Sequence, residues 1–229
     1  MNAERGTMNC KTTGFQFIVQ RSAFIVSFHP PLFYICCVRV IAGQYRGRVL
    51  KSPPSLQTRP TSDRLRETLF NVLAPRIDGA RFLDLCAGTG AIGIEALSRG
   101  AAFVTFVDRV HKMCALVEEN LDMLGVPEEL TEVVKSEAAE YLKRTGEGRR
   151  DWRAGTEPWD IVFFDPPYTS DYLAALREFG EHTASLLRDG GVLVVEHHHK
   201  NALPETLGGL RRWRVLKQGD SALSFYEAA

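Results

Sequence analysis

The sequence lacks an uninterrupted apolar run long enough to cross a membrane. Apolar clusters occur within residues 15–37, but Gln20-Arg21 and Pro30-Pro31 interrupt them before they reach the roughly 18 residues of a membrane span. Arg21 also breaks the apolar region that a secretory signal peptide would need, and no clean small-residue cleavage site follows. We therefore expect a cytoplasmic protein that has no membrane partner.

Paired cysteines and an excess of charge are also missing. The five cysteines, at positions 10, 36, 37, 86 and 114, form no Cys-x-x-Cys spacing, and their odd number suits a reducing compartment. Lys and Arg together number 28, as do Asp and Glu, so the net charge gives no indication of a nucleic-acid partner. Any such indication must come from how the charges are distributed.

A metal-binding cluster is not expected either. His197-His198-His199 is the run that most suggests a metal site. Successive residues of a strand point to opposite faces, so three adjacent histidines cannot converge on one ion unless the chain bends. We read Cys86 and Cys114 as packing residues, since nothing near them in the sequence supplies a base for a nucleophile.

An alternation of strands and helices begins at Arg81. The apolar pattern predicts strands at 81–86, 103–108, 130–135, 160–165 and 191–196, with helices at 91–98, 111–124, 171–187 and a short one ending at 142. Late strands at 211–217 and 222–227 flank Gln218-Gly219-Asp220, which is typical of a hairpin turn. Such alternation indicates an α/β fold with a mostly parallel sheet that helices cover on both faces.

The region before Arg81 divides into two parts. Residues 1–37 read as a poorly ordered extension or a start assigned too far upstream. In residues 38–75, Arg39–Ala42 and Gly47–Leu50 flank a turn and predict a hairpin, and a capped helix runs to about Leu73. Residues 76–229 are then the catalytic domain.

A glycine loop follows the first strand of the alternation. Gly88-x-Gly90-x-x-Gly93 matches the dinucleotide fingerprint, and Asp108 lies 20 residues after Gly88, so a nicotinamide enzyme is one alternative. Asp84 favours a different ligand, because a carboxylate beside a pyrophosphate is repulsive, whereas it suits the ammonium and sulfonium of S-adenosylmethionine. Asp84 could instead be a turn or capping residue.

Two further acids end strands or begin helices on the same edge. Asp108 can accept hydrogen bonds from two ribose hydroxyls, or it can cap the next helix. Glu137 can reach an adenine amino group, or it can favour the positive end of a helix dipole. The cofactor-binding residues we expect are Asp84, Ala87, Gly88, Thr89, Gly90, Asp108, Arg109, Glu137 and Ala138.

Asp165-Pro166-Pro167-Tyr168 is the most informative motif. It ends an apolar strand, and the two prolines make the loop stiff and remove its N–H donors. Asp165 and the carbonyl of Pro166 can then accept both hydrogens of a planar amino group, while Tyr168 stacks on the base. This arrangement suits methylation of an exocyclic amine, for which positioning and polarisation supply most of the catalysis.

These motifs resemble those of class I amino-methyltransferases. More narrowly, Arg39–Gly43, Arg46-Gly47-Arg48 and Arg59–Asn71 resemble the opening of the RsmD family, bacterial guanine N2-methyltransferases of 16S ribosomal RNA. The resemblance spans Arg39 to Tyr226. It implies a Rossmann-like class I fold with a seven-stranded, mostly parallel sheet, one antiparallel strand and an amino-terminal hairpin, and S-adenosylmethionine as the cofactor.

Two features of this sequence depart from the family's pattern. The family begins near Val38, so residues 1–37 have no counterpart, and the acid after the third strand is usually Asp rather than the Glu137 found here. The resemblance implies ribosomal RNA as the partner, possible association with a small-subunit assembly, and a monomeric enzyme.

Basic residues are concentrated near the start of the resemblance. Residues 39–66 contain seven Lys or Arg and one Asp, a local charge of +6, which suits phosphate contacts. The RNA-binding residues we expect there are Arg39, Arg46, Arg48, Arg59 and Arg64. A second cluster is Arg211, Arg212, Arg214 and Lys217. Either cluster could instead be a solvated charged face.

The leading interpretation is an RNA guanine N2-methyltransferase. A DNA adenine or cytosine amino-methyltransferase is the nearest alternative, although 229 residues leave no room for a large target-recognition domain. A nicotinamide oxidoreductase and a non-catalytic RNA-binding module are the others; binding alone does not require Asp165.

Overall fold

The structure, a computed structural model, describes residues 38–53, 63–148, 157–166 and 172–228. The predictions made for Arg59, Pro167, Tyr168 and residues 1–37 concern positions that lie outside the described residues. Cys36–Ala229 form one compact unit. No helix among the described residues is long and apolar enough to span a membrane.

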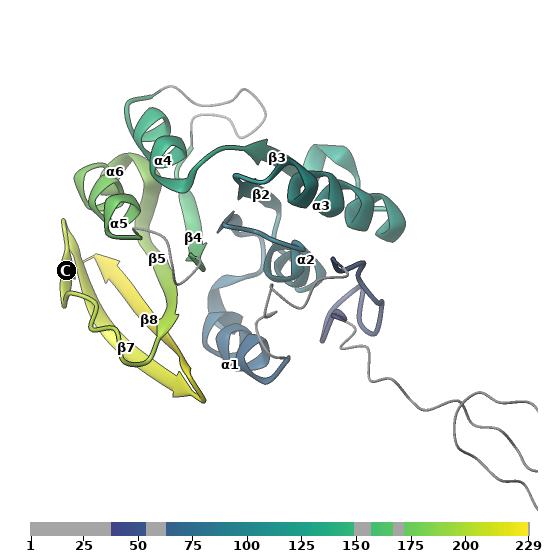
Figure 1. The fold of residues 1–229 in the computed structure, drawn as a ribbon, viewed down its shortest axis with the longest axis horizontal. Coiled ribbons are helices and arrows are strands. Elements are labelled where there is room, and N and C mark those ends of the chain that lie inside the picture. The colour runs from purple at the N-terminus through teal and green to yellow at the C-terminus, as the bar shows by residue number, and fades with distance from the viewer. Residues whose placement is uncertain (1–37, 54–62, 149–156, 167–171, 229) are drawn as a thin grey trace, which may run out of the picture. The chain divides into compact units, whose positions relative to one another are not determined.

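The unit is built on one eight-stranded sheet in the order β3-β2-β1-β4-β5-β8-β7-β6 (Figure 1). The strands are β1 (Arg81–Leu85), β2 (Phe103–Asp108), β3 (Thr131–Lys135), β4 (Trp159–Phe164), β5 (Leu187–His198), β6 (Thr206–Leu207), β7 (Leu210–Gln218) and β8 (Ser221–Ala228). The first five in this order are parallel, and β8 pairs antiparallel with β5 and with β7. The Rossmann-like fold class is therefore confirmed.

The sheet differs from the expectation at its far edge. A two-residue strand, β6, pairs antiparallel with β7, so eight strands rather than seven are described and both β6 and β8 run against the others. So short a strand carries no alternating pattern, which is why the sequence did not indicate it.

Helices cover both faces of the sheet. One face carries α1 (Asp63–Leu73), α2 (Ala91–Ser98) and α3 (His111–Leu124); the other carries α4 (Ala138–Gly146), α5 (Tyr172–Glu181) and α6 (Thr183–Leu186). Short 3-10 turns lie at Ala74–Arg76 and Glu128–Leu130. The helix expected at 171–187 is thus two helices, and α4 continues past Leu142 to Gly146.

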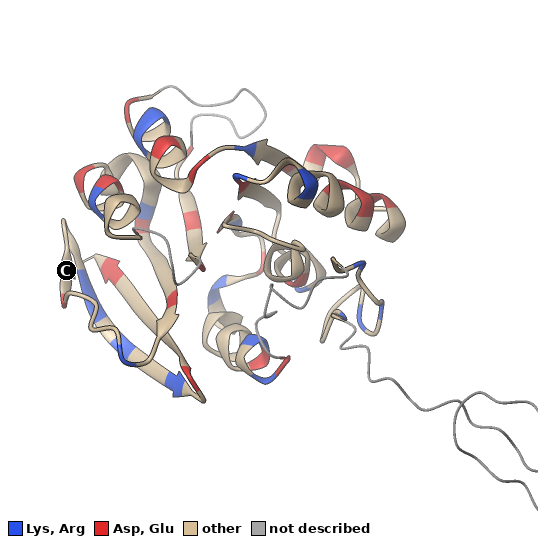
Figure 2. Ribbon diagram, viewed as in Figure 1, with Lys and Arg blue, Asp and Glu red and all other residues tan. Residues whose placement is uncertain are grey.

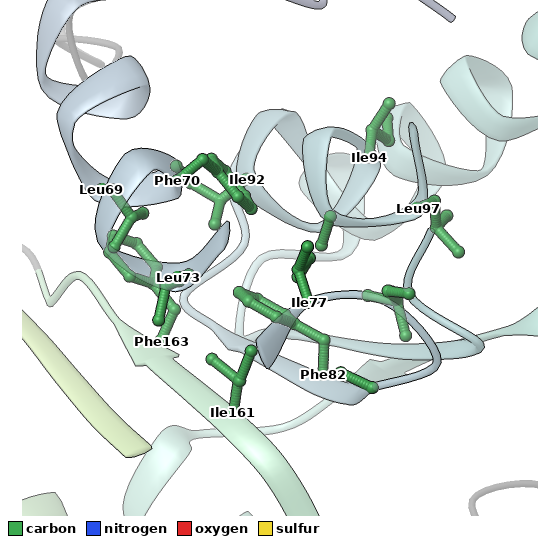
Figure 3. Packing of buried hydrophobic residues seen from close by; sticks show 14 of the residues in the cluster. Leu69, Phe70, Leu73, Ile77, Phe82, Ile92, Ile94, Leu97, Ile161 and Phe163 are labelled. Carbon is green, nitrogen blue, oxygen red and sulfur yellow. The ribbon is translucent and has the colours of Figure 1, made fainter. Parts of the chain in front are cut away.

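The alternation of side chains along the buried strands divides the core into two layers. Phe82 of β1 packs with the α1, α2 and α3 residues, whereas Leu83 and Leu85 pack with α4, α5 and α6. Figure 3 shows the first layer, in which Phe82 lies among side chains that include Ile77 and Ile161. Parallel strands that are buried on both faces read as continuous apolar runs, as they do here.

The amino-terminal segment, residues 38–53, is fastened to α2. Its chain folds back on itself with one antiparallel bridge between Arg39 and Val49. The fully buried Glu95 of α2 accepts hydrogen bonds from the backbone of Ile41 (2.7 Å) and Ala42 (3.0 Å). A buried carboxylate needs such donors to be tolerated, so Glu95 fixes where this segment lies.

Candidate active site

The glycine loop links β1 to α2 through a tight turn. Gly88 and Gly90 have φ of 55° and 77°, a region that favours glycine, and Gly90 is the residue before the first turn of α2. The Ala87 N–H donates to the carbonyl of Val107 on β2 (3.0 Å), and the Gly90 N–H donates to the Ala87 carbonyl (2.8 Å). The start of α2 is thereby held at the carboxyl ends of β1 and β2, where open α/β sheets bind ligands.

The third glycine of the fingerprint serves packing. A Cβ at Gly93 would lie 2.2 Å from Cε1 of Phe106, so only glycine lets α2 approach β2 this closely. The Gly93 N–H also donates to Oδ2 of Asp84 (2.9 Å). Gly93 of α2 therefore packs against β2 and also binds the carboxyl group of Asp84.

Asp84 is buried at the carboxyl end of β1. Burial raises the pKa of its carboxyl to about 7, and the nearby Asp108 charge adds to the rise, while the Gly93 hydrogen bond opposes it. An acid that titrates near neutrality can be ionised by a cationic ligand.

Asp108 ends β2 beside the glycine loop. Its Oδ2 accepts a hydrogen bond from the Gly88 N–H (2.9 Å), and its Oδ1 accepts one from the Val110 N–H (2.8 Å). Asp108 does not cap α3, whose N-cap is Val110 without a side-chain capping bond, and each of its oxygens keeps a second lone pair for an incoming hydroxyl.

Arg109 and Glu137 lie opposite each other where β2 and β3 end. Arg109 Nη1 is 3.6 Å from Glu137 Oε1, and both side chains are more than half exposed. Glu137 precedes α4, and no side-chain capping bond from it is found. Ala138 follows as the first residue of α4 and packs against the core.

Asp165 follows β4 in the centre of the sheet. Its N–H donates to the carbonyl of Leu85 on β1 (3.3 Å), which continues the ladder one residue past the strand. Burial and the neighbouring charges of Glu196 and Asp84 hold the pKa of its carboxyl well above the usual range. Pro166, the next residue, is buried.

The sequence reasoning missed Glu196, although it lies inside a predicted strand. It is 4% exposed on β5, and its charge acts on Asp165. A glutamate that interrupts the apolar run Val192–Val195 was the available signal, since a charge in a strand buried on both faces is costly.

The carboxylates gather around the thiol of Cys86. Burial raises the pKa of this thiol, and the charges of Asp108, Asp165, Asp84 and Glu137 each raise it further. Cys86 also has a φ of 66°, which is rare outside glycine. It therefore lies in the loop where the acids meet and is held as a thiol, not a nucleophile.

This acidic edge fits a cationic cofactor. Within the described part of the chain, Asp84, Asp108 and Asp165 have no Lys or Arg ion-pair partner. Their negative charge suits an ammonium and a sulfonium, and it would repel a pyrophosphate. The residues present are consistent with S-adenosylmethionine and not with a dinucleotide.

Several basic side chains of residues 38–66 are paired with acids and are therefore less available to RNA than the composition suggests. Arg66 is 1% exposed and bonds to Asp63 Oδ1 (2.8 Å), while Lys51 pairs with Glu119 (2.9 Å). Arg39 lies 3.4 Å from Asp63. Among the expected RNA-binding residues, Arg46, Arg48 and Arg64 are exposed without an ion pair to another described residue. Figure 2 shows the basic positions on this segment and along β7.

The second basic cluster lies on β7. Arg212 donates to the carbonyl of Leu203 (2.8 Å), whereas Arg211, Arg214 and Lys217 are exposed. Trp213, between two of these arginines, is 44% exposed and rests on Phe225 with ring centroids 5.6 Å apart. A cation-rich strand with an exposed aromatic side chain is compatible with nucleic acid.

His197 stays apart from the other two histidines and bonds to Ser224 Oγ (2.9 Å), and the chain bends only after His198. β5 ends at His198 and a turn follows, so ligand atoms of His198, His199 and Asp220 lie within 4.8 Å of one another. His198 Nδ1, however, accepts a hydrogen bond from the Lys200 N–H (3.1 Å). That backbone bond occupies Nδ1, and we assign no metal role to the group.

Comparisons with known proteins agree on the family. The family model of Conserved hypothetical protein 95 matches residues 38–227. Ribosomal RNA small subunit methyltransferase D of Escherichia coli strain K12 is 37% identical over 196 residues, which cover 83% of this chain and 89% of that protein. YlbH of Bacillus subtilis strain 168 is 36% identical over 190 residues, covering 83% of this chain and 98% of its own.

A solved structure of a similar protein supports the same family and fold. That of yhhF from Escherichia coli has 35% sequence identity and a TM-score of 0.71, covering 84% of this chain and 98% of that one. The sheet order, the glycine loop and the acidic edge all agree with the class I fold of S-adenosylmethionine-dependent methyltransferases. Because that family model matches residues 38–227, the chain belongs to the Conserved hypothetical protein 95 family, which is the RsmD family that its motifs resemble.

Proposed function

We propose that the chain transfers the methyl group of S-adenosylmethionine to the exocyclic N2 amine of a guanine in small-subunit ribosomal RNA. The observation that carries the proposal is the set of acids at the carboxyl ends of β1, β2 and β4, where Asp84, Asp108 and Asp165 meet around one loop. The name of the Escherichia coli relative supports ribosomal RNA of the small subunit as the substrate. The choice of guanine N2 rests on the family resemblance.

On this proposal, the first two acids hold the cofactor. Asp84, which is buried and has a pKa of about 7, would hold the methionine ammonium, whose positive charge would favour the ionised carboxyl. Asp108, already fixed by the Gly88 and Val110 N–H groups, accepts the ribose hydroxyls with its remaining lone pairs. The bound cofactor supplies an electrophilic methyl group.

Asp165 acts on the amine. Its backbone is fixed to β1 by the bond to Leu85, so its carboxylate is held at the sheet edge beside the glycine loop. It accepts a hydrogen bond from the amino group and orients the nitrogen lone pair toward the methyl group. Pro166, which has no N–H, leaves its carbonyl for the second amino hydrogen. Tyr168, which follows Pro167 in the same sequence motif, would stack on the base.

The dinucleotide alternative has lost its basis. Gly88-x-Gly90-x-x-Gly93 lies in a methyltransferase fold, where Gly93 packs on Phe106 and donates to Asp84. A role in ribosome assembly would place the activity in the cytoplasm.

The experiment is methyl transfer from radiolabelled S-adenosylmethionine to bacterial small-subunit RNA, supplied free and as assembled subunits, followed by nucleoside mass spectrometry. We expect N2-methylguanosine with wild-type protein and none with Asp165→Asn. Calorimetry with S-adenosylhomocysteine should give the same affinity for both within several-fold. Methylated adenine or cytosine in DNA would instead support the DNA alternative, and more than about a tenth of wild-type activity in Asp165→Asn would remove the role given to Asp165.

A further inference from the structure

The carboxylate of Glu196 lies beside the acid of the Asp-Pro-Pro-Tyr motif. Phe163 and Phe164 of β4 pair with Val194 and Val195 of β5, and the next residues along the two parallel chains are Asp165 and Glu196. Neighbouring strands are about 4.8 Å apart, so the two side chains start from adjacent positions.

Both side chains project from the same face of the sheet. Phe163 and Val194 belong to the core layer under α1, α2 and α3, and Asp165 and Glu196 each follow two residues later. Side chains two apart on a strand share a face. Asp84, the register partner of Phe163, lies on this face of β1 one row earlier.

Placing three acids on one buried face is costly. Glu196 is 4% exposed and Asp84 is 2% exposed, and the Glu196 charge is the largest charge effect that raises the pKa of Asp165. Two carboxylates that share one site cannot both ionise cheaply, so an ionised pair binds its first proton tightly. The core would be easier to build with an apolar residue at position 196, as at Val192 and Val194.

We propose that Glu196 is a positioning residue that acts through Asp165: the charge of its carboxylate makes Asp165 basic enough to take the proton of the methylated amine, which the two carboxylates then share. This inference rests on the proposed methyltransferase function. It assigns to β5 a part in the reaction that the motif on β4 does not include.

The reaction balances through the pair. The amine nitrogen forms its bond to the methyl carbon as the carbon–sulfur bond breaks, and that bond's electron pair stays on sulfur as a neutral thioether. The nitrogen becomes positively charged and passes one proton to the Asp165 carboxylate. The pair, which then shares this one proton, returns it to water.

Other titratable groups surround the pair and do not replace it. Asp84 and the Cys86 thiol face it from β1 and the loop that follows. His197 lies on the opposite face of β5 and bonds to Ser224 Oγ (2.9 Å). On the covering helices, Arg66 of α1 is held by Asp63, and Glu95 of α2 is held by Arg99.

The test is the pH profile of kcat for methyl transfer by wild type, Glu196→Gln and Glu196→Asp, with the exposed Glu129→Gln as control. Glutamine removes the neighbouring charge, so the low-pH side of the kcat profile (the acid limb) should move to lower pH by about one unit or more. The kcat at pH 7 should fall about tenfold, because Asp165 becomes a weaker base. Aspartate keeps the charge and should keep the limb. Affinity for S-adenosylhomocysteine should stay within about threefold, because the pair acts on the amine.

A folded Glu196→Gln variant whose acid limb coincides with that of wild type, whatever its rate, overturns the inference and makes Glu196 structural. The same coupling can be measured without activity. In protein with ¹³C-labelled glutamate carboxyls, the titration midpoint of Glu196 should fall when Asp165 is replaced by Asn, and an unchanged midpoint overturns the inference. This measurement stands even if Glu196→Gln does not fold. If wild type does not methylate RNA at all, the proposed function fails while the titration still decides the coupling.

Discussion

Asn120 on α3 joins the carbonyl of Thr89, in the glycine loop, to the amino-terminal segment. Its Nδ2 donates to Thr89 O (3.0 Å) and to Lys51 O (3.2 Å), and its Oδ1 accepts the Lys51 N–H (2.8 Å). The side chain is fully buried. One amide therefore couples the part of the chain expected to meet RNA to the part expected to hold the cofactor.

Replacing Asn120 with Ala should loosen both parts. The Lys51 N–H would lose its acceptor, and a buried unsatisfied donor costs about 1–3 kcal/mol. We expect a lower free energy of unfolding by about that amount and an affinity for S-adenosylhomocysteine that is several-fold weaker. Urea denaturation and calorimetry measure the two effects. The exposed Asp122→Ala on the same helix is the control, and a variant with wild-type cofactor affinity would show that the glycine loop does not depend on this bond.

Asp84 should make the protein less stable as the pH rises. Its carboxyl has a pKa of about 7 in the folded protein, against 3.8 as its ordinary value, so between these limits the folded state holds a proton that the unfolded state has lost. The stabilisation is complete below about pH 4 and gone above about pH 7, and it amounts to about 4 kcal/mol at most. Asp84→Asn should therefore match wild type at pH 4 and exceed it in stability at pH 8.

Urea denaturation across this pH range checks the prediction. Asp165 contributes a slope of the same sign, so the informative quantity is the difference between the two proteins at each pH. Cofactor binding gives a second measure. Affinity for S-adenosylhomocysteine should rise between pH 6 and pH 8 in wild type more than in Asp84→Asn. Parallel stability curves for the two proteins would mean that folding does not raise the pKa of Asp84.

Gly93 should tolerate no side chain. A Cβ would lie 2.2 Å from Phe106 Cε1, and the Phe106 ring is fully buried, so α2 must move away from β2. Overpacking of this kind costs about 1–3 kcal/mol. Gly93→Ala should lower the melting temperature and weaken cofactor binding, because the same residue donates to Asp84. Gly209→Ala, where nothing lies within 4 Å of the added carbon, is the matched control.

The central sheet could be predicted because its strands are apolar runs that alternate with helices whose apolar residues recur at helical spacing. β2 and α3 were predicted with the residue limits that the structure has. The edge of the sheet could not, since β6 has two residues and makes its contacts only once β7 is in place. Nor could the break between α5 and α6, because the apolar spacing continues across His182.

The site was predicted as separate motifs and not as an arrangement. Asp84, Asp108 and Asp165 were each recognised from the strand they end, yet their mutual effect depends on strand order, which a sequence pattern does not contain. Glu196 was missed for the same reason: it has no motif, and its neighbour lies 31 residues away on another strand. Arg66 was counted in the local charge of +6, although its side chain is buried and bonded to Asp63.

The amino-terminal segment should hold RNA backbone through Arg46 and Arg48. Both are exposed and pair with no described acid, and Arg48 reaches only the carbonyl of Met123 (3.1 Å). Phosphate contacts release counterions, so replacing both with Ala should weaken RNA binding and reduce its salt dependence by a slope of about 1–2 units. Affinity for S-adenosylhomocysteine should not change, since neither side chain is part of the acidic edge.

The control for this prediction is the double variant Lys143→Ala and Arg177→Ala, which removes the same charge from α4 and α5 on the opposite face of the sheet. Filter binding of small-subunit RNA across a range of salt concentrations measures both variants. If Arg46 and Arg48 can be removed with no change in affinity or slope, the segment is a structural support held by Glu95. The RNA path would then run along β7, where Arg211 and Arg214 flank the exposed Trp213, and the same measurement on their alanine variants would locate it.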